Sequence, residues 1–115
     1  MNQKMNPEAK AKIVDALRSG NYKQGKTYLR TSDDCFCVWG VISDVSGASA
    51  WAWDKDKDAH YDFGYCVPAK SVQDWVGMDW SDAAVTIDGI AVTLSVHNDR
   101  GASFEKIADA IEQQL

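Results

Sequence analysis

The dipeptide Asp88-Gly89 separates two short apolar runs, AVTI and IAVTLSV, in the last third of the sequence. A type I′ turn needs positive φ at both of its central residues, and Asp-Gly adopts that conformation at low cost. The sequence therefore predicts a β-hairpin with a two-residue turn, in which Ile87 lies opposite Ile90. One face of this hairpin is expected to be apolar. Its members would be Val85, Ile87, Ile90, Val92, Leu94 and Val96.

An amphipathic helix is predicted after the hairpin, over residues 103–114. Ser103 is a favourable N-cap, and the segment FEKIADAIEQQL that follows it places apolar residues at helical spacing. The residues between hairpin and helix, HNDRG, are expected to form a connecting turn, because Asn, Asp and Gly favour turn geometry. This block indicates the α+β fold class.

Two further helices are predicted from the residues at their ends. The first spans residues 7–19, with Asn6 as its N-cap and Pro7 at its first helical position. The other spans residues 68–76 and begins at Pro68. Both are followed by glycine, which is typical of the position after a last helical turn.

The apolar stretch CFCVWGVI, within residues 34–46, fits two structures. Its apolar residues fall at helical spacing, with Asp33 or Ser32 as a cap and Gly47 as a stop. As a continuous apolar run it also fits a buried strand, and periodicity alone does not separate the two. We expect a helix over 34–46, because the apolar stripe is regular and both end signals are in place.

Aromatic residues alternate on both sides of a charged segment in residues 49–65. Trp51 and Trp53 precede the segment DKDKDAH, and Tyr61 is the first of the aromatic residues that follow it. This pattern predicts an aromatic β-hairpin or an irregular extended excursion. The whole sequence of 115 residues thus predicts a single α+β domain of about four helices with a C-terminal β-hairpin.

The charge of the chain argues against nucleic acid as a partner. The net charge is −5, whereas proteins that bind the nucleic-acid backbone normally present a basic stripe. No apolar run approaches the roughly 20 residues that span a bilayer, and the N-terminal segment lacks the apolar core of a secretory signal. We therefore expect a cytoplasmic protein with no membrane partner and with reduced cysteines. Basic residues do gather in the first part of the chain: Lys4, Lys10, Lys12, Arg18, Lys23, Lys26 and Arg30.

The carboxylates Asp54, Asp56 and Asp58 have the spacing that opens a calcium-binding loop. The rest of that pattern is absent, because Ala59 and Tyr65 stand where the loop requires Gly and Glu. The alternating Asp and Lys residues also neutralise one another. A solvated loop tip is the main interpretation, and a weak cation site is the alternative.

The cysteines and histidines do not match a known ligand or catalytic pattern. Cys35 and Cys37 form C-x-C instead of the C-x2-C knuckle that usually holds zinc, and there is no second pair. Buried free thiols are the simpler interpretation. A hydrolase that uses Cys66 with His97 or His60 is an alternative, although no cysteine has a recognisable nucleophile context. We predict a protein without catalytic activity, metal or cofactor.

Three segments resemble a group of small uncharacterised proteins encoded by bacteriophages and prophages. They are ALRSGNYKQGKTYLRTSDDCFCVWGVISDVSG, VPAKSVQDWVGM and LSVHNDRGASFEKIADAIEQQL. In that group the corresponding segments carry a CCxxGV-like helix, a proline-started helix ending in Trp-x-Gly-Leu, and a Leu-Asn-Asp-x-Gly-x-Ser-Phe-x-x-Ile-Ala-x-x-Ile ending. This sequence departs from the group in residues 49–65 and at His97. The resemblance implies a related fold and a phage setting, and it favours a helix over residues 34–45.

Small size, an acidic balance and five tryptophans together predict an accessory protein that binds another protein. The resemblance implies that this accessory protein is phage- or prophage-derived and that its expected partner is a host protein. Aromatic anchors beside an acidic tip would suit a basic patch on that partner. The residues predicted to form the binding face are Trp51, Trp53, Asp54, Asp56, Asp58 and Tyr61. The alternative function is a small-ligand or cation-binding module that uses the same segment. Self-association into a homo-oligomer is also compatible with the sequence.

Overall fold

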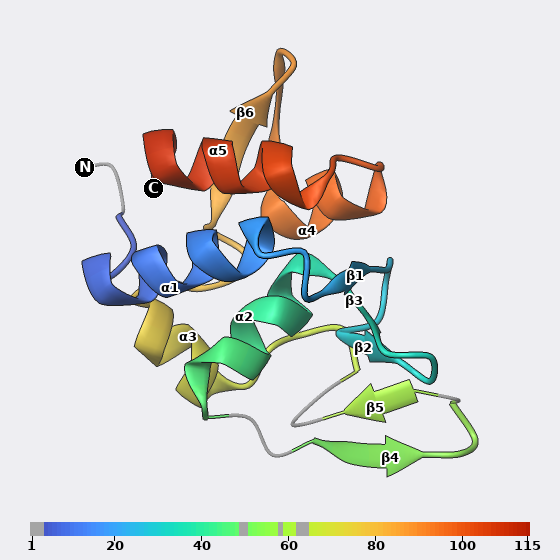
Figure 1. Cartoon of the computed structure of the whole chain (residues 1–115). Helices are drawn as coiled ribbons and strands as arrows, with labels where there is room; N and C mark the ends of the chain where they lie inside the picture. Colours follow the sequence, from blue (N-terminus) through green and yellow to red (C-terminus); the bar gives the residue numbers. More distant parts are fainter. Residues whose placement is uncertain (1–3, 49–50, 58, 62–64) are drawn as a thin grey trace.

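Two helices from opposite ends of the chain lie side by side and run in opposite directions (Figure 1). The structure, a computed structural model, describes residues 4–48, 51–57, 59–61 and 65–115. Helix α1, Pro7–Arg18, begins where the Asn6 side chain accepts a hydrogen bond from the Glu8 N–H at 3.0 Å. Helix α5, Phe104–Gln114, begins where the Ser103 hydroxyl accepts from the Lys106 N–H at 3.2 Å. Both predicted N-caps are therefore confirmed.

The paired helices α1 and α5 join the beginning of the described chain to its end. The Met5 N–H donates to the Leu115 carbonyl at 3.0 Å, and both of these side chains are buried. At the far end of α1, Arg18 contacts Asp109 at 2.6 Å and Glu112 at 3.0 Å. These contacts fix the two helices along their whole length.

Helix α2, Val38–Ser46, lies at the centre of the fold and packs on α1, on α3 (Lys70–Val76) and on α4 (Leu94–Asp99). Its first two turns are buried on all sides, with Val38, Trp39, Val41 and Ile42 inaccessible to solvent. A helix that is apolar all round is stable only when it is surrounded by protein. The core therefore forms between helices, and the strands lie at its margins.

A five-stranded sheet lies against one side of this helical core. Its strands are β1 (Lys23–Gln24), β2 (Arg30–Thr31), β3 (Cys35–Phe36), β4 (Ala52–Asp54) and β5 (Ala59–Tyr61). Their order in the sheet is β1-β3-β2-β5-β4, with β1 parallel to β3 and the other pairs antiparallel. The predicted hairpin in residues 49–65 is thus present as β4–β5, and β4 forms one edge of the sheet.

The ambiguous stretch 34–46 contains both of the structures that its sequence fits. Cys35 and Phe36 form strand β3, and the helix begins only after Cys37, so the expectation of a helix from residue 34 is wrong at its start. Asp34 has a φ of 58°, a left-handed conformation that does not occur inside an α-helix. Asp34 lies in the turn between β2 and β3, so helix α2 begins only after the end of β3.

The predicted hairpin near the end of the chain is confirmed in its turn and register. Strands β6 (Ala84–Ile87) and β7 (Ile90–Thr93) pair Ile87 with Ile90, and both turn residues have positive φ. The expected continuation of the strand through Leu94 and Val96 is wrong, because helix α4 begins at Leu94. Helical spacing buries Leu94 together with His97 and Asn98, whereas Val96 remains 42% exposed. The described chain therefore has five helices, two of them after the hairpin, and the α+β class is confirmed.

A buried polar connection joins strand β1 to the turn between α4 and α5. The Asn98 amide donates to the Gly25 carbonyl at 2.8 Å and accepts from the Gln24 amide at 2.9 Å. Gln24 in turn accepts from the Phe104 N–H at 3.2 Å. Asn98 is wholly inaccessible to solvent, so these bonds satisfy polar groups that water cannot reach.

Candidate functional site

The β4–β5 hairpin carries a row of side chains across three strands. Trp53 is paired with His60, and His60 is paired with Arg30, so the three residues belong to β4, β5 and β2 in turn. Directly opposed residues of neighbouring strands place their side chains on the same face of a sheet. The ring centroids of Trp53 and His60 are 5.0 Å apart, which is contact distance for two rings. His60 is further fixed by a 3.1 Å contact between its Nδ1 and the Thr31 carbonyl oxygen.

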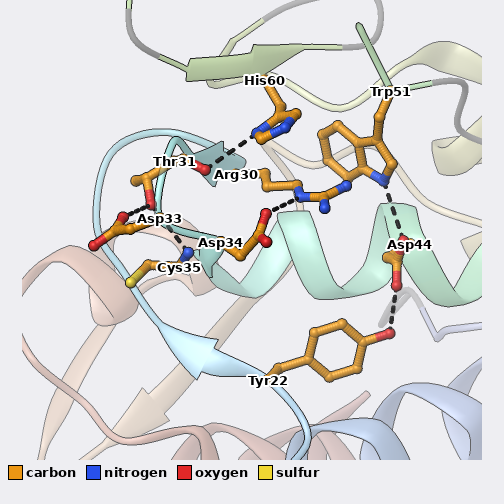
Figure 2. A network of polar contacts seen from close by, with 9 residues as sticks. All are labelled: Tyr22, Arg30, Thr31, Asp33, Asp34, Cys35, Asp44, Trp51 and His60. Atoms are coloured by element: carbon orange, nitrogen blue, oxygen red, sulfur yellow. Dashed lines mark hydrogen bonds and ion pairs between the residues drawn. The ribbon is translucent and has the colours of Figure 1, made fainter. Parts of the chain in front are cut away.

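Arg30 lies within a group of aromatic rings next to this row. Its guanidinium carbon lies 5.3 Å from the centroid of Phe36 and 5.5 Å from that of Trp51. Figure 2 shows the guanidinium extending toward Trp51, while its Nε donates to Asp34 at 2.8 Å. A cation over aromatic faces is attracted by the ring quadrupoles. These contacts hold Arg30 and Trp51 in one arrangement.

Asp44, on helix α2, links this aromatic group to the helical core. One carboxylate oxygen accepts from the Tyr22 hydroxyl at 2.6 Å, and the other accepts from the Trp51 indole N–H at 3.1 Å (Figure 2). Partial burial, followed by the hydrogen bond to Asp44, raises the pKa of Tyr22 to about 12. Trp51 is thus half-buried and fixed on three sides, which makes it a structural anchor for the start of β4.

The turn that follows β4 is closed by one of the predicted carboxylates. Asp54 accepts from the backbone N–H groups of Asp56 at 2.9 Å and Lys57 at 3.3 Å, and from the Tyr65 hydroxyl at 2.5 Å. The hydrogen bond from Tyr65 is the main cause that lowers the pKa of Asp54. Lys57 lies over the Tyr65 ring at 5.9 Å. Asp54 therefore stabilises the turn, and its oxygens are already engaged.

The structure places the residues of the predicted binding face in different environments. Trp53 is 49% exposed and Asp56 is exposed, whereas Trp51 and Asp54 are committed to internal contacts. Asp58 and the side chain of Tyr61 lie outside the described residues. Across residues 4–48, 51–57, 59–61 and 65–115, no three His, Cys, Asp or Glu side chains are grouped to hold a metal ion.

Sequence reasoning missed the residues that support this face. Arg30 counted only as one of several basic residues, and Tyr22 and Asp44 received no role. Their partners lie in other elements or turns: Tyr22 and Asp44 are 22 residues apart, and Asp44 and Trp51 are 7 residues apart. A periodic pattern of apolar residues indicates the buried face of a single helix or strand. The contacts of Tyr22, Arg30 and Asp44 join different elements, so no such pattern indicates them.

The cysteines and histidines occupy separate environments. Cys37 is buried at the N-cap of α2, and that burial raises its pKa to about 11. Cys66 is exposed, and its pKa is raised by partial desolvation and by the negative charge of Asp99. Both imidazoles contact backbone carbonyl oxygens, His60 that of Thr31 and His97 that of Val85 at 2.8 Å. Within the described residues, no hydrogen bond connects either imidazole to a thiol.

None of the helices in the described part of the chain is both long and apolar enough to cross a membrane.

Comparison with known proteins identifies one family. No curated protein and no solved structure matches the sequence. Residues 5–115 match the family described as "Domain of unknown function (DUF8296)". Because this match spans nearly the whole sequence, the chain belongs to the DUF8296 family.

Proposed function

We propose that this protein acts by binding another protein through strand β4 and the exposed side chain of Trp53. The observation that carries the proposal is the position of β4 at the edge of the five-stranded sheet, with Trp53 49% exposed on it. Large aromatic side chains supply much of the energy of protein interfaces when they are held rigidly. The ring of His60, tilted by 60° relative to that of Trp53, contacts Trp53 and restrains it in this way.

The backbone of β4 offers a second source of affinity. An edge strand carries N–H and C=O groups that no neighbouring strand uses, and an extended segment of a partner can pair with them. Ala52 and Trp53 are both exposed, so such a segment would have access to the strand. The aromatic group around Arg30 and Trp51 keeps the strand in place, which lowers the entropic cost of binding.

The charge of the protein indicates which kind of partner fits. The net charge is −5, and Asp56 is exposed at the tip of the hairpin. A basic surface on the partner would be steered by the overall negative charge, which raises the association rate. At the tip itself the exposed Lys55 and Lys57 flank Asp56, so Asp56 contributes a local contact more than long-range steering. The resemblance of three segments to phage and prophage proteins supports a bacterial host protein as this partner.

The proposal is tested by capturing partners from bacterial lysate with the tagged full-length chain. Wild type is compared with Trp53→Ala and with a matched control, Val96→Ala, which trims an apolar residue on α4 that is 42% exposed. We expect one stoichiometric partner, identified by mass spectrometry, that is retained by the control and lost with Trp53→Ala. Asp56→Asn should weaken capture and reduce its dependence on salt. Equal capture by all variants would rule out β4 as the binding surface.

A further inference from the structure

A second candidate site lies at the other end of the molecule from β4. A hollow of about 310 Å³ opens between the tip of the β6–β7 hairpin and the turn that joins α4 to α5. Figure 1 shows this hairpin and β4 on opposite sides of the helical core. A volume near 300 Å³ is at the lower end of the range for small-ligand sites. The residues that line it are Ile87, Asp88, Ile90, His97, Arg100, Gly101, Ala102, Ser103 and Lys106.

Two cationic side chains line this hollow, and only one of them is free of an ion pair within the described structure. Lys106 forms an ion pair with Asp88 at 2.8 Å, so these two charges largely neutralise one another. The guanidinium of Arg100 has neither a hydrogen bond nor an ion pair to any residue that the structure describes. Arg100 therefore gives the hollow a net positive charge in a protein whose overall charge is −5. A carboxylate is the group that a guanidinium binds through two parallel hydrogen bonds.

His97 adds a hydrogen-bond acceptor to the same hollow. Its side chain is only 3% exposed, and its Nε2 lies 2.8 Å from the carbonyl oxygen of Val85. A carbonyl oxygen can only accept, so Nε2 carries a hydrogen, and in the tautomer with its hydrogen on Nε2 the Nδ1 atom is an acceptor. No described residue donates a hydrogen bond to this Nδ1. An acceptor that has no partner among the described residues and lies at a hollow favours a ligand that brings an N–H group.

Two isoleucines add an apolar part to the wall. Ile87 and Ile90 are paired across the hairpin turn, and Ile90 is 38% exposed. An exposed isoleucine next to a hollow offers contact area to an aliphatic group of a ligand. The hollow thus presents three kinds of contact side by side: a cation, a hydrogen-bond acceptor and an aliphatic surface.

In a larger hollow, the lysine and the amide of the wall are already engaged with other groups of the described chain. This hollow has a volume of about 560 Å³ and lies at the end of α3. Its Lys70 is paired with Asp74 at 2.9 Å, and the amide of Gln73 both donates to Pro68 and accepts from Trp80. Size alone therefore does not single out a binding site here, whereas the unsatisfied groups of the smaller hollow do.

We propose that the hollow between the β6–β7 tip and the α4–α5 turn binds an N-acylated aliphatic amino acid with a free carboxylate. The carboxylate would pair with Arg100, the acylated N–H would donate to His97 Nδ1, and the aliphatic side chain would pack on Ile87 and Ile90. These groups occur together in the C-terminal residue of a polypeptide and in free N-acyl amino acids. This site is independent of β4, because it uses a different sheet.

The proposal is tested by titrating the isotope-labelled full-length protein and recording amide and guanidinium NMR shifts. The first probe is N-acetyl-Ala-Gly-Leu as the free acid, the second is the same peptide with a C-terminal carboxamide, and the third is N-acetyl-leucine. We expect the free acid to shift the signals of Ile90, Arg100 and Lys106, and to bind at least tenfold more tightly than the carboxamide. Tighter binding of the tripeptide than of N-acetyl-leucine identifies a polypeptide terminus as the ligand. Equal binding by both acids identifies the free N-acyl amino acid.

Two variants locate the contact. Arg100→Gln removes an exposed cation whose side chain makes no hydrogen bond or ion pair to the described residues, so the fold is expected to persist. Affinity for the acid should fall about tenfold. Lys12→Gln removes the same charge from an exposed position on α1 and should leave affinity unchanged. Any of three results would overturn the proposal. They are equal affinity for the acid and the carboxamide, unchanged affinity of Arg100→Gln for the acid, and no NMR shift at about 10 mM acid.

Discussion

The carbonyl oxygen of Leu29 occupies the space in which a side chain on Gly40 would begin. A Cβ atom built on Gly40 would lie 1.7 Å from that oxygen and 2.7 Å from its carbonyl carbon. Helix α2 and the backbone that enters β2 can therefore touch only because residue 40 has no side chain. The neighbours are backbone atoms, which cannot rotate away as a flexible side chain could.

This contact predicts a large loss of stability for Gly40→Ala. The added methyl group must push α2 away from Leu29, and we expect the free energy of unfolding to fall by about 3 kcal/mol or more. Urea denaturation followed by tryptophan fluorescence measures the change. Gly20→Ala is the control, because a Cβ there meets no atom within 4 Å and only the positive φ of 78° is strained. That control should cost about 1 kcal/mol; equal losses in both variants would show that steric contact is not the cause.

The buried side chain of Asn98 predicts a second sensitive position. Asn98→Ala removes a wholly buried amide that donates to the Gly25 carbonyl and accepts from the Gln24 amide. The Gln24 amide then keeps only its bond to the Ala102 carbonyl at 2.7 Å. We expect a loss of about 2–4 kcal/mol in the free energy of unfolding, measured by the same denaturation experiment. Asn21→Ala, at an exposed asparagine, should change stability by about 0.5 kcal/mol or less. A similarly small effect at Asn98 would contradict a structural role for this connection.

The two tryptophans of the predicted binding face should respond differently to truncation. Trp51→Ala removes the hydrogen bond to Asp44 and the contacts with Phe36 and Arg30, so stability should fall by about 2–3 kcal/mol. Trp53→Ala removes a side chain that is half exposed, so the cost should be about 1 kcal/mol or less. Thermal or urea unfolding of both variants measures the two losses of stability. The opposite ranking would mean that Trp53, and not Trp51, anchors strand β4.

The raised pKa of Tyr22 predicts a loss of stability at alkaline pH. An unfolded tyrosine releases its proton near a pH of about 10, whereas the folded Tyr22 holds its proton until its pKa of about 12. Between these values the folded state binds more protons than the unfolded state, so stability falls as the pH rises. The stability difference between wild type and Tyr22→Phe should therefore shrink between roughly pH 9 and pH 11.5. A difference that stays constant over this range would show that Tyr22 titrates normally.

The environments of the thiols predict an order of chemical labelling. Cys66 is exposed, whereas Cys37 is 4% exposed and its pKa is raised to about 11, so it forms little thiolate at neutral pH. An Ellman reaction on the folded protein should label Cys66 first, and Cys37 only after denaturant is added. Cys66→Ser identifies the fast phase by removing it. Rapid labelling of Cys37 in the folded chain would show that α2 opens at its first turn.

The elements that the sequence predicted correctly are those with signals confined to a few residues. Asp88-Gly89 determines its turn through the backbone of those two residues, and Asn6 and Ser103 cap helices through bonds that reach two or three positions ahead. Helix α4 was missed because Leu94 and Val96 fit an alternating strand as well as a short helix. Only burial of His97 and Asn98 against distant residues favours the helix, and that contact is not visible in the local sequence.

The candidate site was predictable in its location and not in its architecture. The alternation of aromatic residues around a charged tip located the β4–β5 hairpin. Which tryptophan is exposed depends on Asp44, Phe36 and Arg30, which come from three other elements. The hollow beside Arg100 likewise forms only when the hairpin tip and the α4–α5 turn come together. Such sites follow from tertiary packing, which acts between residues far apart in the chain.

The hydrogen bond from Met5 to Leu115 couples the two ends of the described chain to each other. Unwinding the last turn of α5 would uncover Met5, and release of the segment before α1 would uncover Leu115, since both side chains are buried at this junction. Fraying at one end therefore costs the contacts of both. The terminal amide hydrogens of α5 and the Met5 amide should consequently exchange with deuterium as slowly as those of the core, through opening of the whole domain.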